Sequence, residues 1–263
     1  MKVPDSKLGV TLFNLRDYCK TKEDLDETLR RVKEIGYKSV QVSGIGPISP
    51  EDVKTLLDKH NLYCCATHEN LDNYENHFEE TVAKLKLWSC NFTALGSPGY
   101  SIKSAEDVDL FSQRLEKIAQ KFQKEGITFA YHNHHTEFVK FSDKTMLEQI
   151  YDSTSNNLFA ELDVHWVQRG GANPIEWLYR MEGRTSLIHF KDMALNFGDG
   201  KFEATPEFAE IGEGNLDWKG IIKACEDTNI RWYVVEQDQT RGKRDIFESI
   251  KLSYDNMIKM GLK

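Results

Sequence analysis

The feature that most limits the possible folds is a regular alternation of two kinds of segment. Short runs rich in β-branched and aromatic residues are each followed by a longer stretch whose apolar residues recur at helical spacing. Eight such runs predict strands, at residues 8–13, 39–42, 62–67, 92–95, 127–132, 158–162, 186–190 and 232–235. The stretches between them predict helices at residues 24–35, 50–59, 73–88, 105–124, 144–151, 174–180, 218–225 and 245–260.

Strict strand-then-helix order, without a Pro-, Gly- or Ser-rich linker, predicts parallel strands joined by right-handed crossovers. We therefore expect an α/β protein whose residues 1–263 close into one (β/α)8 TIM barrel. A doubly wound open sheet is the alternative, but neither G-x-G-x-x-G nor G-x-x-x-x-G-K-[ST] follows the first predicted strand. Residues 196–217 lack clear periodicity, and a loop there would lie over the barrel mouth and could act as a lid.

Charge and composition narrow the class of function. The 42 acidic residues outnumber the 34 Lys and Arg residues, which gives a net charge of −8 with no basic block to follow a phosphate backbone. Nucleic acid is therefore not an expected partner. We expect no membrane partner either, because no apolar run reaches the length of a bilayer span. The five cysteines lack CxxC spacing and no apolar leader is visible, so we expect a cytoplasmic protein with reduced thiols.

Three of the predicted strands end in a potential metal ligand, namely Asp163, His189 and Glu236. The carboxyl ends of parallel barrel strands lie at one face of the barrel, where such folds place their active sites. Two carboxylates and one imidazole suit Mn²⁺, Mg²⁺, Co²⁺ or Zn²⁺ better than a soft metal. Each residue alone is more often a helix cap or an ion-pair partner, but three of them together predict a site for one divalent metal.

The fifth predicted strand adds a cluster of histidines. Strand alternation places His132 and His134 on one face, and Asn133 and His135 on the other. Glu137 follows just after the strand and can reach back over the mouth. A surface tract or a set of core histidines is the plain interpretation, but the cluster as a whole favours membership of the site.

Two further charged residues share faces with the predicted ligands. Lys191 lies two residues beyond His189 and could hold a substrate oxygen or stabilise an enolate. The alternative is a solvated lysine paired with Asp192. Glu161 lies two residues before Asp163, deeper in the barrel, where a carboxylate needs a partner such as Lys191 or a histidine. We expect Glu161 to be one of the substrate-binding residues.

Weaker candidates for substrate binding lie at other strand ends. His68 closes the third predicted strand, and His165 and Trp166 follow the sixth. Trp166 could form an apolar wall for a sugar ring, although core packing fits it equally well. Gln41 and Ser43, at the end of the second strand, are the weakest of these candidates.

Several motifs in the C-terminal half carry a family resemblance: Tyr-His-Asn-His at 131–134, Glu-Leu-Asp-Val-His-Trp at 161–166, Gly-Gly-Ala-Asn-Pro at 170–174, His-Phe-Lys-Asp-Met at 189–193, Gly-Glu-Gly-Asn-Leu-Asp-Trp at 212–218 and Val-Glu at 235–236. With these motifs the chain resembles the xylose isomerase-like TIM-barrel superfamily of sugar phosphate isomerases and epimerases. That superfamily includes tagatose-type epimerases, inosose dehydratases and, more remotely, endonuclease IV. The N-terminal half agrees only in its strand–helix rhythm.

The resemblance implies one divalent metal, held by carboxylates of strands five and eight, an aspartate of strand six and a histidine of strand seven. Asp163, His189 and Glu236 match this pattern. On strand five the usual glutamate aligns with His132, and the nearest carboxylate is Glu137. Either residue would complete the ligand set; we favour Glu137 and expect His132 to act as a catalytic or outer residue.

The resemblance also implies a reaction on a keto-sugar or related polyol. Such enzymes chelate adjacent oxygens of a hydroxy-ketone and stabilise an enediolate after a base removes the intervening proton. Reprotonation gives an isomer or epimer, whereas loss of a leaving group makes the enzyme a dehydratase or eliminase on an inosose or 3-keto-glycoside. The bases would be Glu137 or a strand-five histidine on one side, and Glu236 or His165 on the other.

Because His132 stands where the family has a glutamate on strand five, epimerisation of the tagatose type is less expected. For the same reason, a non-catalytic sugar-binding barrel is an alternative. An endonuclease IV-like activity is disfavoured, because it needs a three-metal cluster and a cationic groove. By resemblance alone, the chain would also form a homo-oligomer.

Overall fold

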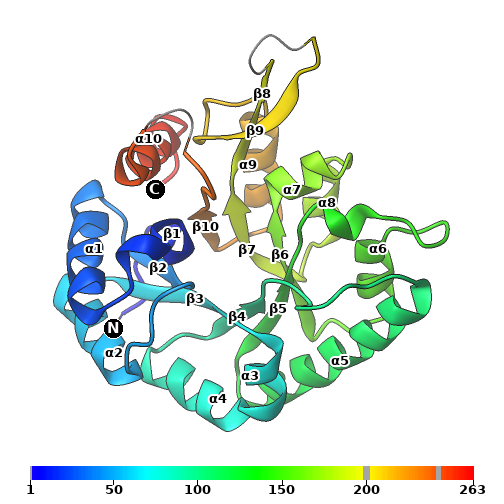
Figure 1. Ribbon diagram of the computed structural model, residues 1–263, viewed down its shortest axis with the longest axis horizontal. Coiled ribbons are helices and arrows are strands. Elements are labelled where there is room, and N and C mark those ends of the chain that lie inside the picture. Colours follow the sequence, from blue (N-terminus) through cyan, green and yellow to red (C-terminus); the bar gives the residue numbers. More distant parts are fainter. Residues whose placement is uncertain (1, 198–201, 241–243) are drawn as a thin grey trace.

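Eight parallel strands close into a barrel, in the order β1-β10-β7-β6-β5-β4-β3-β2 (Figure 1). The computed structural model describes residues 2–197, 202–240 and 244–263. The barrel strands are β1 Leu8–Thr11, β2 Ser39–Val42, β3 Tyr63–Glu69, β4 Phe92–Leu95, β5 Thr128–His132, β6 Leu158–Asp163, β7 Thr185–Phe190 and β10 Trp232–Val235. The predicted (β/α)8 TIM barrel is confirmed, and the open doubly wound sheet is not the fold.

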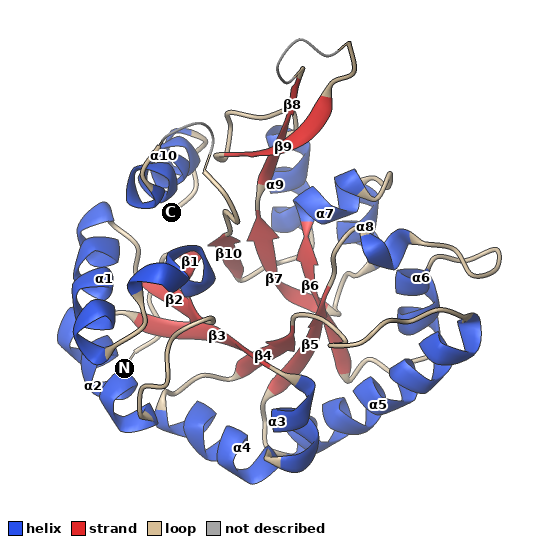
Figure 2. Ribbon diagram, in the orientation of Figure 1, coloured by secondary structure: helices blue, strands red, loops and turns tan. Residues whose placement is uncertain are grey.

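Helices surround the barrel (Figure 2). They are α1 Lys22–Ile35, α2 Pro50–His60, α3 Leu71–Asn76, α4 Phe78–Leu87, α5 Ala105–Lys124, α6 Met146–Asp152, α7 Val164–Arg169, α8 Pro174–Arg180, α9 Trp218–Asp227 and α10 Ile246–Lys259, with 3-10 turns η1 Leu12–Tyr18 and η2 Thr136–Phe138. Side-chain caps define most starts; Thr21 and Asp24 form a capping box on α1, and Ser104 caps α5. Within the described residues, no helix combines the length and apolarity needed to cross a bilayer.

The first strand is shorter than predicted, because residues 12–13 belong to η1, and three larger differences separate the sequence prediction from the structure. The helix expected at 73–88 is two helices, because His77 has non-helical angles (φ −124°, ψ 39°). Helix α7 was not expected, and it starts directly after β6 because the Asp163 side chain accepts a hydrogen bond from the N–H of Trp166 (3.1 Å). The segment expected to be a loop contains β9 (Thr205–Ala209), which pairs antiparallel with β8 (Asp192–Asn196). Residues 198–201 of that segment lie outside the described part, and the lid stays a prediction.

The barrel interior changes character along its axis. A cluster drawn only from strand residues, including Phe92, Leu187 and Trp232, fills part of it with apolar side chains. Toward the carboxyl ends of the strands, buried side chains are polar or charged, as at Gln41 and Glu161. This polar layer positions the site.

Candidate metal centre

Four side chains at neighbouring strand ends converge on one point. We call His132, Asp163, His189 and Glu236 the metal group; one potential ligand atom from each lies within 4.8 Å of the others. His132 and Asp163 end β5 and β6, His189 is in β7, and Glu236 follows β10 directly. Register explains the convergence, because Asp163 pairs with His189 across parallel strands. The structure therefore brings together the three ligands predicted at strand ends and adds His132 to them.

The metal group has the properties of a cation site. All four residues are at least 94% buried, and two carboxylates with two imidazoles match the preferences of Mn²⁺, Mg²⁺, Co²⁺ and Zn²⁺. Oδ2 of Asp163 and Nδ1 of His132 are buried without a hydrogen-bond partner among the described residues. Buried polar atoms normally have partners, so these two atoms are available to a bound ion.

Glu137, the favoured strand-five ligand, does not join the metal group. Its Oε1 accepts a hydrogen bond from the Tyr131 hydroxyl (2.7 Å). Its Oε2 accepts from the backbone N–H of His134 (2.8 Å) and from the Thr136 hydroxyl (3.0 Å). Both oxygens are therefore engaged in fixing the turn after β5, and the geometry favours His132 as the fourth ligand.

Lys191 supplies a positive charge next to the metal group. Its ammonium lies 3.0 Å from Oε2 of Glu236, 3.5 Å from Oδ2 of Asp163 and 2.5 Å from Oδ2 of Asp238. Burial alone would lower the pKa of Lys191, but these carboxylates outweigh it and raise the pKa. For Asp163, burial dominates over Lys191 and raises the pKa to about 8. Glu236 and Asp238 thus compensate the charge of this lysine inside the protein.

Asp192, the alternative partner of Lys191, serves another purpose. Its carboxylate accepts hydrogen bonds from the Trp218 indole (2.6 Å) and from the backbone N–H groups of Gly212 (2.9 Å) and Gly214 (3.0 Å). A Cβ on Gly214 would lie 2.2 Å from that carboxylate, so the close approach requires glycine. Asp192 therefore holds the loop before α9 against the barrel.

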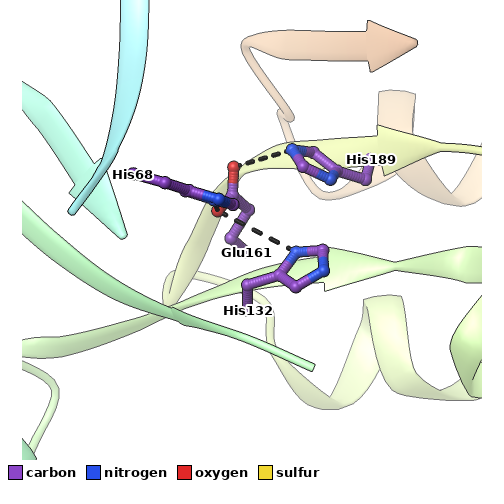
Figure 3. A group of neighbouring side chains, drawn as sticks. All are labelled: His68, His132, Glu161 and His189. Carbon is purple, nitrogen blue, oxygen red and sulfur yellow. Dashed lines mark hydrogen bonds and ion pairs between the residues drawn. The ribbon is translucent and has the colours of Figure 1, made fainter. Parts of the chain in front are cut away.

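A second group of side chains lies beside the metal group and shares two members with it. We call His68, His132, Glu161 and His189 the inner group (Figure 3). Glu161 lies between two rings, with Oε2 2.5 Å from Nε2 of His68 and Oε1 2.9 Å from Nε2 of His189. Burial would raise the pKa of Glu161, but the two imidazoles outweigh it and lower the pKa. Glu161 is expected from sequence to bind substrate, yet its carboxylate is fully buried and engaged with histidines.

The two nitrogens of His189 face different partners. Nδ1 lies 3.1 Å from Glu236 in the metal group, and Nε2 faces Glu161 and the Gln41 side-chain oxygen (2.7 Å). Gln41 also donates a 2.7 Å hydrogen bond to Glu161. A carboxylate on one ring nitrogen orients the other nitrogen of a metal-binding histidine. Glu161 and Gln41 therefore orient His189 toward the metal group.

A cavity of about 630 Å³ opens onto these residues. His68, His134 and Lys191, all expected to contact substrate or take part in catalysis, line it together with His132 and Glu236. His134 approaches His132, with 4.9 Å between ring centroids. Burial lowers the pKa of His134 and of His132, so both rings are neutral near neutral pH.

His165 and Trp166, two predicted substrate contacts, are not among the described residues that line this cavity. Nδ1 of His165 lies 3.0 Å from the Asp192 carbonyl, and the ring stacks on Phe208 at 4.9 Å. The Trp166 ring lies 4.7 Å from the Lys191 ammonium. These residues support Lys191 from behind, which is the packing interpretation of Trp166.

Sequence reasoning missed two residues of the site. Asp238 bonds Lys191, and its position two residues after Glu236 is the signal that could have found it. Asn133 binds both backbone groups of Asp163, accepting from its N–H (3.0 Å) and donating to its carbonyl (3.4 Å). Asn133 thus fixes the end of β6 to the end of β5.

Comparison with known proteins agrees with the barrel fold. The family described as xylose isomerase-like TIM barrel matches residues 29–255. An inosose dehydratase from Clostridium perfringens is 21% identical over 245 residues, which cover 79% of this chain and 81% of that protein. A sugar phosphate isomerase/epimerase from Parabacteroides distasonis superposes with a TM-score of 0.81, at 20% identity, covering 97% of this chain and 98% of that one. A probable 3-DHS dehydratase from Bacillus anthracis gives a TM-score of 0.70 at 13% identity, covering 96% and 98%.

Proposed function

The chain belongs to the family of xylose isomerase-like TIM barrels, and from this premise we propose that it is a divalent-metal-dependent sugar isomerase or epimerase. The substrate would be a keto-sugar or a related polyol, and the reaction would move a proton on the carbon next to a carbonyl. One observation carries the proposal: the metal group places four potential ligand atoms within 4.8 Å of one another, and two of its residues, His132 and Glu236, line a cavity.

His132, Asp163, His189 and Glu236 would hold the metal in this proposal. A bound divalent ion would polarise a substrate carbonyl and acidify the neighbouring C–H. Glu161 keeps His189 oriented, and Asn133 fixes the backbone of Asp163. The protein thus supplies a site whose ligands are held in place before an ion or a substrate arrives.

His68 and His134 are the groups we propose for proton transfer. Both line the cavity, and their rings lie 5.4 Å and 4.9 Å from the His132 ring. His68 is oriented by its contact with Glu161, and neutral His134 can accept a proton. The Lys191 ammonium, which also lines the cavity, would hold a substrate oxygen on which negative charge develops.

A dehydratase acting on an inosose or a 3-keto-glycoside is the second candidate. The similarity to inosose dehydratases over about four fifths of both chains favours it. The two activities share the first proton removal and differ only in the fate of the resulting carbanion.

One experiment separates these candidates from a sugar-binding barrel. Metal-depleted protein is reloaded with Mn²⁺, Mg²⁺, Co²⁺ or Zn²⁺ and incubated in D₂O with keto-hexoses and with an inosose. We expect metal-dependent deuterium incorporation next to the carbonyl, with a new sugar for an isomerase or epimerase and an ultraviolet-absorbing enone for a dehydratase. Stoichiometric metal with neither deuterium exchange nor enone formation from any substrate would contradict both enzymatic proposals.

A small-molecule sugar is the partner we propose, in a cytoplasmic protein. The five buried, unpaired cysteines support that location. A homo-oligomer remains the expectation drawn from the family.

A further inference from the structure

A buried asparagine holds the backbone on both sides of Glu236, a member of the metal group. Asn14 lies in η1, the turn that follows β1, and it is 7% exposed. Its side-chain N–H donates to the Val235 carbonyl (3.0 Å), and its side-chain oxygen accepts from the backbone N–H of Gln237 (2.8 Å). These two peptide groups come directly before and after Glu236. One amide side chain therefore fixes the chain around this residue.

The end of β1 explains why a side chain serves this purpose. The register of β1 with β10 ends at the pair Val10 and Val235, and after Thr11 the chain turns into η1. Buried peptide groups need hydrogen-bond partners, and an asparagine amide offers the same donor and acceptor as a peptide group. Asn14 therefore continues the pairing of β1 with β10 beyond the last backbone pair.

Other groups anchor the turn that carries Asn14. The Thr11 hydroxyl accepts from the backbone N–H of Phe13 (3.3 Å), and the side chains of Leu12 and Leu15 are fully buried. Contacts outside the metal group thus determine the position of η1. The amide of Asn14 is therefore preset before an ion or a substrate binds.

The same arrangement occurs at Asp163, the other carboxylate of the metal group. Asn133, which follows β5, accepts from the N–H of Asp163 and donates to its carbonyl. Strand β5 neighbours β6, and β1 neighbours β10. In both cases, a buried asparagine that follows the neighbouring strand binds the backbone at a carboxylate of the metal group.

Backbone position matters for Glu236 because of what its carboxylate contacts. Its oxygen Oε2 lies 3.1 Å from Nδ1 of His189 and 3.0 Å from the Lys191 ammonium, and both residues belong to the site. The backbone connects Glu236 to the rest of the barrel, since its N–H donates to the Phe190 carbonyl (3.0 Å) and Asn14 binds the two adjacent peptide groups. A functional site tolerates displacements of only about 0.5 Å. A small shift of this segment would therefore change where the carboxylate can reach.

We propose that Asn14 is a positioning residue of the metal centre and sets the reach of Glu236 toward the bound ion. The inference rests on the proposed function, because that function makes Glu236 a metal ligand. Asn14 is not among the described residues that line the cavity. It therefore acts through Glu236 and not by contact with a substrate.

The test compares metal affinity with stability in two matched variants of the full chain. Asn14→Leu removes both hydrogen bonds at similar side-chain size. Asn256→Leu is the control, because Asn256 is 8% exposed in α10 and also donates to a buried backbone carbonyl, that of Ile211 (2.9 Å). Both variants should lower the denaturant midpoint of the metal-free protein, since each leaves a buried carbonyl without its donor.

Only Asn14→Leu should also change metal binding. Its Mn²⁺ affinity, measured by competition with a chromophoric chelator, should fall about 10- to 100-fold. The visible absorption of bound Co²⁺, which depends on ligand geometry, should change as well. Asn256→Leu should keep the affinity and the absorption of the wild type.

A double-mutant cycle tests whether Asn14 acts through Glu236. In a chain that already carries Glu236→Gln, the further change Asn14→Leu should lower the Mn²⁺ affinity by less than about three-fold. Losses that multiply fully in the double variant would overturn the inference, because Asn14 would then act by another route.

The outcomes separate this inference from the proposed function. Equal Mn²⁺ affinity of the wild type and Asn14→Leu overturns the inference and leaves the proposed function intact, as does an equal loss in Asn256→Leu. A wild-type chain that binds no Mn²⁺ contradicts the proposed function and the inference together. If Asn14→Leu does not fold, Asn14→Ala leaves room for a bridging water and should weaken Mn²⁺ binding about 3- to 10-fold; unchanged binding overturns the inference.

Discussion

The two sides of the barrel mouth are built from the same strand–helix unit, but one side carries charged and polar side chains and the other carries many apolar ones. Strands β5, β6, β7 and β10, with the residues that follow them directly, contribute buried acids, imidazoles and Lys191. The segments after β1, β2 and β3 contribute apolar side chains that line the cavity and that we call the apolar wall: Phe13, Ile45, Ile48, Leu71 and Trp88. Both sides line one cavity. In our proposal the charged side would hold the reacting atoms, and the apolar side would contact other parts of a ligand.

The two sides are also stabilised differently. The apolar wall gains free energy by leaving water, at about 25 cal/mol per Å² of buried apolar surface. On the charged side, burial removes the hydration of the charged groups, and contacts between opposite charges offset that cost. The contacts of Lys191 with three acidic side chains are an example. Changes on the charged side should therefore have larger effects than changes on the wall.

The largest effect is expected for Asp163→Asn. This change removes a proposed metal ligand but keeps an oxygen that can cap α7 through the Trp166 N–H. Metal content should fall below stoichiometric, and turnover should drop about 10³-fold or more, because the metal supplies several kcal/mol to the transition state. Asp217→Asn, the same change at the exposed cap of α9, is the matched control. Unchanged metal content in Asp163→Asn would contradict the proposed role of Asp163 as a metal ligand. It would also contradict the expectation that changes on the charged side have the larger effects.

The next effect is on stability. Lys191→Met leaves the carboxylates of Asp163, Glu236 and Asp238 without their cation, which should cost the metal-free protein about 3–5 kcal/mol. Added Mn²⁺ should recover much of the loss. Lys223→Met removes an exposed pair with Asp227, and because solvent screens such pairs it should leave the stability nearly unchanged. Denaturant unfolding with and without a chelator measures both variants, and equal stability of the two in chelator would refute compensation by Lys191.

A smaller effect, on metal affinity, is expected for a change at Glu161, which contacts the proposed ligand His189. Glu161→Gln weakens the support of His189 and should lower metal affinity about 10- to 100-fold. Glu69→Gln, in the strand that leads to the apolar wall, should leave metal affinity unchanged. Competition with a chromophoric chelator gives both affinities. If the two variants behaved alike, the orientation of His189 by Glu161 would be ruled out.

The smallest effect concerns pH. Burial raises the pKa of Asp163 to about 8, above its unfolded value of 3.8. The folded, metal-free protein therefore holds this proton more tightly than the unfolded chain does, and its stability falls as the pH rises from 3.8 to about 8. A metal needs the deprotonated carboxylate. The stabilisation by Mn²⁺ should therefore grow between about pH 6 and pH 8, by up to about 1.4 kcal/mol per pH unit for each proton that a ligand releases to the solvent. Thermal unfolding measures this, and a metal effect that falls over this range would contradict the assignment of Asp163.

The sequence predicted the charged side better than the wall, for a physical reason. A ligand at the end of a parallel strand is visible locally, because the strand pattern itself places Asp163 and His189 at one face. The metal-binding and helix-capping interpretations of Asp163 are compatible, since one oxygen caps α7 while the other faces the metal group. The apolar wall has no such local signal, because Phe13, Leu71 and Trp88 resemble any core residues until the loops are placed.

The remaining features that the sequence did not predict depend on contacts that become visible only in the folded structure. Glu137 is close in sequence to the site, yet Tyr131 and the turn after β5 engage its carboxylate. Gln41 ranked among the weakest candidates from sequence because its partners, Glu161 and His189, are far away along the chain. The break at His77 was hidden because the apolar pattern continues across it.

Anomalous diffraction from crystals grown with Mn²⁺ is the most direct test of the metal group. The account predicts one peak within about 2.0–2.3 Å of atoms from His132, Asp163, His189 and Glu236. Crystals with no peak at that position, and with Lys191 still bridging Asp163 and Glu236, would contradict it.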